Sequence, residues 1–181
     1  MSRPSEPPPA KLIVGLLFRE VEAQGKALGI LQERYGPLDL LTEPIPFVHT
    51  TYYDGEMGPG LLRQVASFEN LVEPGALPDI KLATNEIETG FCLGGKRRVN
   101  LDPGILTEER LILASGKNFT HRVYLRDGIY ADLTLIYQKG GYRALPWTYA
   151  DYREPLILHF LKALKRKLLF QRTGRLPRTL S

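Results

Sequence analysis

Five residues in and beside one predicted hairpin have side chains that could hold an anion. They are Lys117, Arg122, Tyr124, Tyr130 and Asp132. The planar guanidinium of Arg122 suits a carboxylate or a phosphate because it can donate two parallel hydrogen bonds. Asp132 would fix the plane of that guanidinium, and the tyrosines would supply stacking surface or hydroxyl contacts. The sequence therefore predicts a ligand-binding site for a phosphate- or carboxylate-bearing molecule, and it identifies no catalytic residue.

These side chains share one face of the hairpin only in one strand register. A three-residue loop, residues 126–128, would place Arg122 opposite Asp132 and Tyr124 opposite Tyr130. A slip of one residue would mix polar and apolar side chains on both faces, so the segregated register is preferred. The alternative to a ligand site is a solvated ion pair across the two strands, flanked by tyrosines that pack under a helix.

A second candidate anion site is the basic stretch Lys96, Arg97 and Arg98. The backbone amides of Gly94 and Gly95, beside three cations, are chemically suited to a phosphate. The stretch follows a predicted helix and precedes a predicted strand, which is not the strand-loop-helix order of a nucleotide-binding P-loop. The alternative is a helix cap followed by the exposed, basic start of a strand.

The histidines and the single cysteine predict no metal site, and nothing in the sequence implies a cofactor. His49, His121, His159 and Cys92 are isolated and match no zinc-ligand spacing. His49 begins an H-x-[ST] element, and two such elements would resemble the two-histidine phosphoesterases. The second element is missing because Val123 takes the hydroxyl position after His121, which the preferred register turns toward the apolar face. We therefore interpret His49 as an ordinary loop histidine and leave enzyme status open.

The excess positive charge of the chain lies at its C-terminal end. The 181 residues include 24 Lys and Arg against 20 Asp and Glu, yet residues 155–181 hold seven cations and no acidic residue. The seven are Lys162, Lys165, Arg166, Lys167, Arg172, Arg175 and Arg178. This segment predicts contact with an RNA backbone or with an anionic membrane surface. In the alternative, a helix packs its leucines on the domain and leaves its cations solvated.

The elements that must position these residues are those of an α+β domain. An apolar run at residues 11–18 predicts a central strand, and helical spacing predicts helices over residues 20–35 and 78–91. The first half therefore has the order β-α-β-β-α. From residue 97 onward, short turns separate strands that must pair antiparallel, and a helix over about residues 154–170 closes the chain. We expect a largely antiparallel sheet with helices packed on one side.

Composition also predicts the domain boundaries and the compartment. Residues 1–10 form a flexible Pro-rich lead, residues 11–170 a single α+β domain, and residues 171–181 a basic tail. No run approaches about 18 apolar residues, so we expect neither a signal peptide nor a membrane span, and a cytoplasmic protein. The oligomeric state is not predicted.

Six strings, spread over most of the chain, carry a family resemblance that extends from about residue 11 to residue 160. They are residues 51–58 (TYYDGEMG), 80–88 (IKLATNEIE), 98–106 (RVNLDPGIL), 111–117 (LILASGK), 121–135 (HRVYLRDGIYADLTL) and 147–153 (WTYADYR). In these strings the sequence resembles DUF4416, a prokaryotic family catalogued as a domain of unknown function. The resemblance implies no activity, so the functional expectation rests on the chemistry of the residues. That expectation is a small anionic ligand on a polar sheet face, and the alternatives are an RNA-binding module that uses the basic C-terminal segment and a non-catalytic protein-interaction domain.

Overall fold

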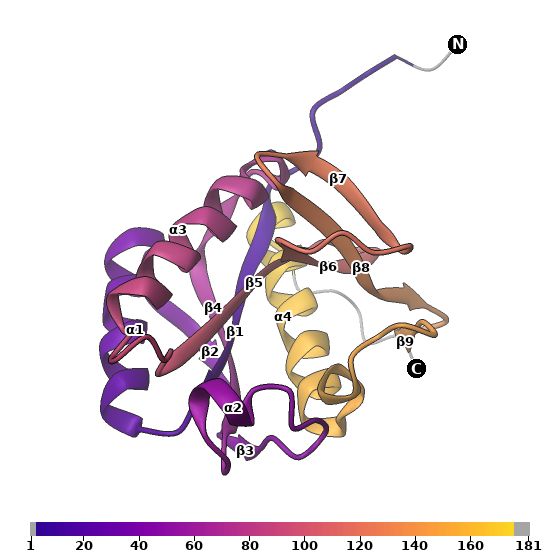
Figure 1. Cartoon of the computed structure of the whole chain (residues 1–181). Helices are drawn as coiled ribbons and strands as arrows, with labels where there is room; N and C mark the ends of the chain where they lie inside the picture. Colours follow the sequence, from indigo (N-terminus) through magenta and orange to yellow (C-terminus); the bar gives the residue numbers. More distant parts are fainter. Residues whose placement is uncertain (1–2, 176–181) are drawn as a thin grey trace.

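The computed structural model describes residues 3–175, which form an open antiparallel sheet of nine strands with helices on both faces (Figure 1). The elements are β1 (Ala10–Phe18), α1 (Val21–Tyr35), β2 (Leu38–Leu41), β3 (Ile45–Pro46), α2 (Asp54–Met57), β4 (Leu62–Val72), η1 (Pro74–Ala76), α3 (Leu77–Gly90), β5 (Val99–Leu106), β6 (Arg110–Ser115), β7 (Arg122–Arg126), β8 (Ile129–Gln138), β9 (Gly141–Ala144), η2 (Ala150–Arg153) and α4 (Pro155–Thr173). The strand order is β2-β4-β1-β5-β6-β8-β7, with β3 beside β4 and β9 beside β8. The predicted α+β class and the largely antiparallel sheet are confirmed.

The central strand β1 divides the core into two layers. All nine of its residues are buried, as expected for a strand that is paired on both edges and covered on both faces. Leu12, Val14 and Leu16 pack against α1 and α3, whereas Ile13 packs in the layer that contains α4. The expectation that the helices pack on one side therefore holds for α1 and α3, while α4 covers the opposite face (Figure 1).

The hairpin of β7 and β8 has the predicted register but a different loop. Arg122 lies opposite Asp132, and Tyr124 lies opposite Tyr130. The predicted three-residue loop is wrong, because Arg126 pairs with Ile129 and only residues 127–128 form the loop. Both loop residues have a positive φ, of 53° and 76°, as a type I′ turn requires. A bulge between Tyr124 and Arg126 absorbs the extra residue and so preserves the register.

The first half of β5 is an open edge within the described chain. β5 pairs with β6 only from Gly104 to Leu106, so the preceding residues have β1 on one side and no strand on the other. Side chains of α3 take the place of the missing strand at Leu101. Lys81 Nζ donates to the Leu101 carbonyl oxygen at 2.8 Å, and the Leu101 amide donates to a Glu88 carboxylate oxygen at 2.7 Å. This edge brings buried polar groups to the middle of the molecule.

Candidate anion-binding site

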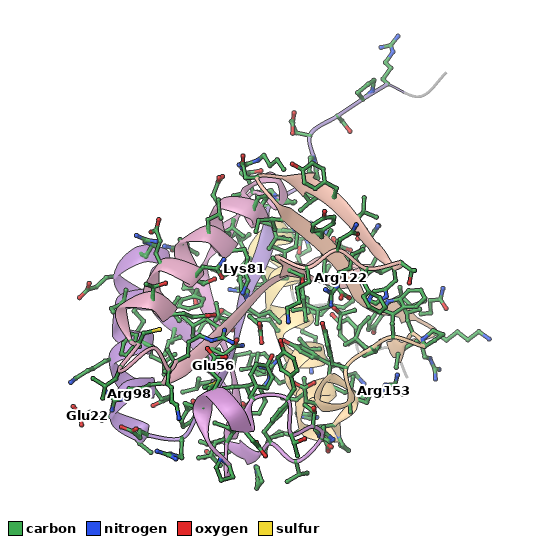
Figure 2. The ribbon with its side chains drawn as sticks, viewed as in Figure 1. Glu22, Glu56, Lys81, Arg98, Arg122 and Arg153 are labelled. Carbon is green, nitrogen blue, oxygen red and sulfur yellow. The ribbon has the colours of Figure 1, made fainter. Side chains whose placement is uncertain are left out.

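A pocket of about 240 Å³ lies where α2, the start of α1 and the turn before β5 meet. Its charged lining consists of Arg19, Glu20, Asp54, Glu56, Lys96, Arg97 and Arg98. Glu56 and Arg98 are labelled on this side of the molecule in Figure 2, beside α2. The second candidate set from the sequence, Lys96 to Arg98, therefore lies in the pocket.

Glycines shape two walls of this pocket. Gly58 ends α2 with a φ of 81°, and a Cβ atom there would lie 2.7 Å from Nη1 of Arg19. Gly94 and Gly95, both with positive φ, form a tight turn that two backbone hydrogen bonds between Leu93 and Lys96 close. The glycine pair is therefore the tip of a small hairpin, and the helix cap considered from the sequence is wrong, because α3 ends before it.

The cations of the pocket fall into paired and unpaired groups. Arg97 donates from Nε and Nη2 to the two carboxylate oxygens of Glu56, at 2.6 and 2.7 Å, and Arg98 forms an ion pair with Glu20. The fork of hydrogen bonds to Glu56 holds the plane of the Arg97 guanidinium.

Three charged groups of the pocket have no partner among the described residues. Within residues 3–175, the Arg19 guanidinium, the Lys96 ammonium and the Asp54 carboxylate form no ion pair and no side-chain hydrogen bond. These groups are therefore available to a ligand.

A network of buried charges leads from the pocket to the interior. Arg97 Nη1 donates to Glu88 at 2.9 Å and to Asn100 at 2.8 Å, and Asn100 donates to Asp102 at 2.8 Å. We call the residues linked in this way the β5 network; Lys81, Arg63 and Asp151 complete it.

Within the β5 network, the pKa values of two carboxylates, Glu88 and Asp102, are shifted in opposite directions. Burial raises the pKa of Glu88, although Lys81 and the Leu101 amide oppose the shift. Burial alone would also raise the pKa of Asp102, but the positive charges of Lys81 and Arg63 hold that pKa below its ordinary value. Asp102 is therefore ionised and is the most accessible carboxylate in the interior part of the network, with 28% of its side chain exposed.

Arg63 crosses the central strand to reach its partners on both sides. Its Nη1 lies 3.2 Å from Asp102 on β5, and its Nε lies 2.9 Å from Asp151 in η2. The guanidinium also lies over the ring of Tyr152, 5.2 Å from the ring centroid. Gly15 on β1 makes this path possible, because a Cβ atom there would lie 2.8 Å from Nη2 of Arg63.

The five residues of the first candidate set lie in the hairpin region, but the guanidinium of Arg122 is occupied. Its Nε donates to Asp132 at 2.9 Å, its Nη1 to Ser115 and to the Lys117 carbonyl oxygen at 2.9 Å each, and its Nη2 to Tyr149 at 2.5 Å. The side chains of Arg122 and Asp132 are only 8% and 2% exposed. Arg122 therefore forms a buried ion pair that joins four segments, and it is not the solvated pair considered from the sequence.

The other members of this set have separate contacts. Lys117 Nζ donates to the Tyr52 hydroxyl at 2.6 Å and lies 4.6 Å from the centroid of that ring. Tyr124 and Tyr130 pack edge to face with ring centroids 5.4 Å apart. Their role in ligand binding remains a prediction.

His121 does not face the apolar side as predicted. Its Nε2 lies 3.3 Å from a carboxylate oxygen of Asp132, and its ring stacks on Trp147 with centroids 5.0 Å apart. The prediction failed because β7 begins at Arg122, so the alternation of the strand does not govern His121.

The basic helix α4 uses part of its charge within the molecule. Lys165 donates to a carbonyl oxygen and lies 3.9 Å from the Tyr137 ring centroid, Lys167 pairs with Glu69, and Arg172 donates to the Pro9 carbonyl oxygen at 2.9 Å. Lys162 and Arg166 remain exposed. Residues 176–181, with Arg178, lie outside the described residues.

The apolar stripe of α4 is buried against the sheet. It consists of Ile157, Phe160, Leu161, Leu164 and Leu168. An uncovered stripe would have favoured the interaction-domain alternative, and the described part of α4 shows none.

The helices of residues 3–175 are too short or too polar to cross a membrane. No group of three or more His, Cys, Asp or Glu side chains in residues 3–175 is arranged to hold a metal ion.

These features define an α+β protein with an open antiparallel sheet, a basic pocket at one side and a buried charge network behind it. Residues 8–168 match the family model described as Domain of unknown function (DUF4416), and the chain belongs to this family. Comparison with the curated proteins found no match, and comparison with the solved structures likewise found none.

All six strings that carried the resemblance contribute side chains to the pocket, the β5 network or the Arg122 ion pair. Examples, in chain order, are Glu56, Lys81, Asp102, Ser115, Asp132 and Asp151. The residues that the sequence did not identify include Arg19, Glu20, Asp54 and Glu56 of the pocket and Arg63 of the β5 network. The string TYYDGEMG was the available signal for Asp54 and Glu56, whereas Arg19 and Arg63 stand outside every string.

Proposed function

We propose that the protein binds a small phosphate- or carboxylate-bearing ligand in the pocket beside α2. The observation that carries the proposal is the pair of cations, Arg19 and Lys96, that line the pocket without a protein partner among the described residues. Hydrogen bonds between such cations and an anionic ligand are charge-assisted and stronger than neutral ones.

The wall around these cations supports the same function. Glu56 and Glu20 hold Arg97 and Arg98 in place, so the pocket has ordered charged walls before a ligand arrives. Ordered walls reduce the free energy that is lost to ordering when a ligand binds, because only the side chains of the two unpaired cations remain to be fixed. The two unpaired cations then supply the attraction.

The pocket is a better location for the ligand than the hairpin. Arg122, the predicted centre of the hairpin site, already donates four hydrogen bonds to protein groups. A ligand there would have to displace those contacts and leave the buried Asp132 carboxylate without its Arg122 partner. Breaking a buried ion pair in this way costs free energy. No such cost applies to Arg19 or Lys96.

Calorimetric titration with inorganic phosphate tests the proposal. We expect the double variant Arg19→Gln and Lys96→Gln to bind phosphate at least tenfold more weakly than the unmodified chain, because two charge-assisted hydrogen bonds are lost. The matched control changes Lys162 and Arg166 to Gln, which removes the same charge from the exposed side of α4. Equal affinities of the two double variants would contradict the proposal.

A further inference from the structure

The acidic member of the pocket that has no partner points to a more specific ligand. We infer that the ligand is a small anion that also carries an ammonium group, and that Asp54 binds this group. The inference rests on the proposed function of the pocket.

Asp54 differs from the other two carboxylates of the pocket. Glu20 is paired with Arg98, and Glu56 receives both hydrogen bonds of the Arg97 fork. The half-buried Asp54 lines the same pocket, yet no side chain of the described residues donates to its carboxylate. A carboxylate in this position repels a simple anion and attracts a positively charged donor.

The balance of the unpaired charges matches such a ligand. Arg19 and Lys96 supply two positive charges and Asp54 supplies one negative charge. A phosphate monoester in its dianionic form, joined to an ammonium group, has the complementary charges. A phosphate without the ammonium would bring a second negative charge into the pocket with the unpaired Asp54 carboxylate, and like charges repel each other.

The size of the pocket favours a small ligand. The volume of about 240 Å³ lies below the range of about 300–1,000 Å³ that is typical of pockets for drug-sized ligands. A short-chain amino phosphate therefore fits the pocket better than a nucleotide.

Two phosphates that differ in one group test the inference by calorimetric titration. Phosphoethanolamine has the ammonium group, and ethyl phosphate presents the same phosphate monoester without it. We expect the unmodified chain to bind phosphoethanolamine at least tenfold more tightly than ethyl phosphate. In Asp54→Asn this preference should disappear, while the affinity for ethyl phosphate stays equal or rises. The control Glu33→Gln removes an exposed carboxylate of α1 and should keep the preference.

Each other outcome overturns a distinct part of the account. Binding of both phosphates with equal affinity to the unmodified chain would overturn the ammonium inference and leave the anion site standing. A preference that persists in Asp54→Asn would remove Asp54 from the site. Equally tight binding of 2-hydroxyethyl phosphate would show that a hydroxyl donor suffices. Absence of binding for both phosphates and for inorganic phosphate would overturn the proposed function itself. The ligand comparison uses the unmodified chain, so it holds even if Asp54→Asn fails to fold.

Discussion

Lys11 and Asp39 form a buried ion pair that joins the central strand to β2. Their side chains are 0% and 1% exposed, and the pair is completed by a hydrogen bond from Lys11 Nζ to the Phe68 carbonyl oxygen at 2.6 Å and by one from Ser67 to Asp39. Removing one partner of a buried pair leaves the other charge without compensation, and this state is more costly than the intact pair is favourable.

Asp39→Asn should therefore destabilise the protein strongly. We expect the free energy of unfolding to fall by about 3–5 kcal/mol, because Lys11 stays buried without its counter-charge. Urea denaturation at pH 7 measures the change. Glu22→Gln, which breaks an exposed pair with Lys26 on α1, is the control and should change the midpoint very little. Similar midpoints for the two variants would show that the Lys11 pair is unimportant for stability.

The same pair predicts a dependence of stability on pH. Burial opposes the ionisation of Asp39, but the hydrogen bonds from Lys11 and Ser67 hold its pKa below the ordinary value. A carboxyl with a lowered folded-state pKa stabilises the fold above the unfolded pKa of about 4, and the effect is lost as the pH falls through the folded pKa. Between pH 5 and pH 3, the unmodified chain should lose more unfolding free energy than Asp39→Asn. Parallel losses in urea titrations would contradict this prediction.

At the scale of elements, the first half of β5 shows how the sheet makes room for function. Among residues 3–175, this part of the strand has no strand partner on one edge, and α3 supplies Lys81 and Glu88 to its backbone instead. The freed space holds the β5 network, which Arg63 enters from β4 across Gly15. The position of the network therefore depends on a glycine in the central strand.

Gly15→Ala should disrupt this crossing. The new methyl group would lie 2.8 Å from Nη2 and 2.9 Å from Cζ of Arg63, so the guanidinium must move away from Asp102 and Asp151. Overpacking of this kind costs about 1–3 kcal/mol. Gly29→Ala in α1 is the matched control, since its Cβ atom meets open space, and it should stabilise the protein by roughly 0.5–1 kcal/mol. Thermal unfolding that gives the same sign for both variants would refute the crossing argument.

Arg122→Lys tests the structural role of the hairpin ion pair. A lysine cannot reproduce the contacts of the guanidinium with Asp132, Ser115 and Tyr149, so we expect a loss of about 1.5–3 kcal/mol in the free energy of unfolding. Phosphate affinity should not change, because the pocket lies elsewhere. Calorimetry and denaturation of the same preparation provide both values. Weaker phosphate binding without a loss of stability would instead place the ligand at the hairpin.

Local patterns in the sequence predicted the helices and strands better than the loop lengths and the faces on which the helices pack. The alternation of side chains in the hairpin set the pairing of Arg122 with Asp132, because a slip of one residue inverts both faces. The bulge beside Leu125 has no comparable signature, so the loop length was wrong. The apolar stripe of α4 indicates that the helix packs on a sheet, but it does not indicate which face.

The pocket and the β5 network were mostly hidden because their contacts join distant parts of the chain. Arg97 and Glu56 are 41 residues apart, and Arg63 and Asp102 are 39 residues apart. No periodicity links such residues, and only the folded sheet brings them together. The basic stretch at residues 96–98 could be identified from composition alone, whereas its acidic partners could not.

For the whole molecule, the cations without a protein partner are not simply those of the basic C-terminal segment. Within the described residues, α4 uses Lys165, Lys167 and Arg172 for contacts with the domain, and Arg172 also holds the lead of the chain at Pro9. In the same part of the chain, Arg19 and Lys96 of the pocket beside α2 have no partner. They belong to residues 1–154, in which acidic residues slightly outnumber Lys and Arg. Any binding of a small anion should therefore centre on the pocket.

A titration of the ¹⁵N-labelled protein with inorganic phosphate, followed by amide ¹H–¹⁵N spectra, would locate the anion on the protein. It locates the ligand on the whole described chain without any substitution. We expect shifts concentrated at Arg19, at residues 54–58 and at residues 93–98, which surround the pocket. Shifts concentrated at residues 115–126 or along α4, with none around the pocket, would contradict this expectation.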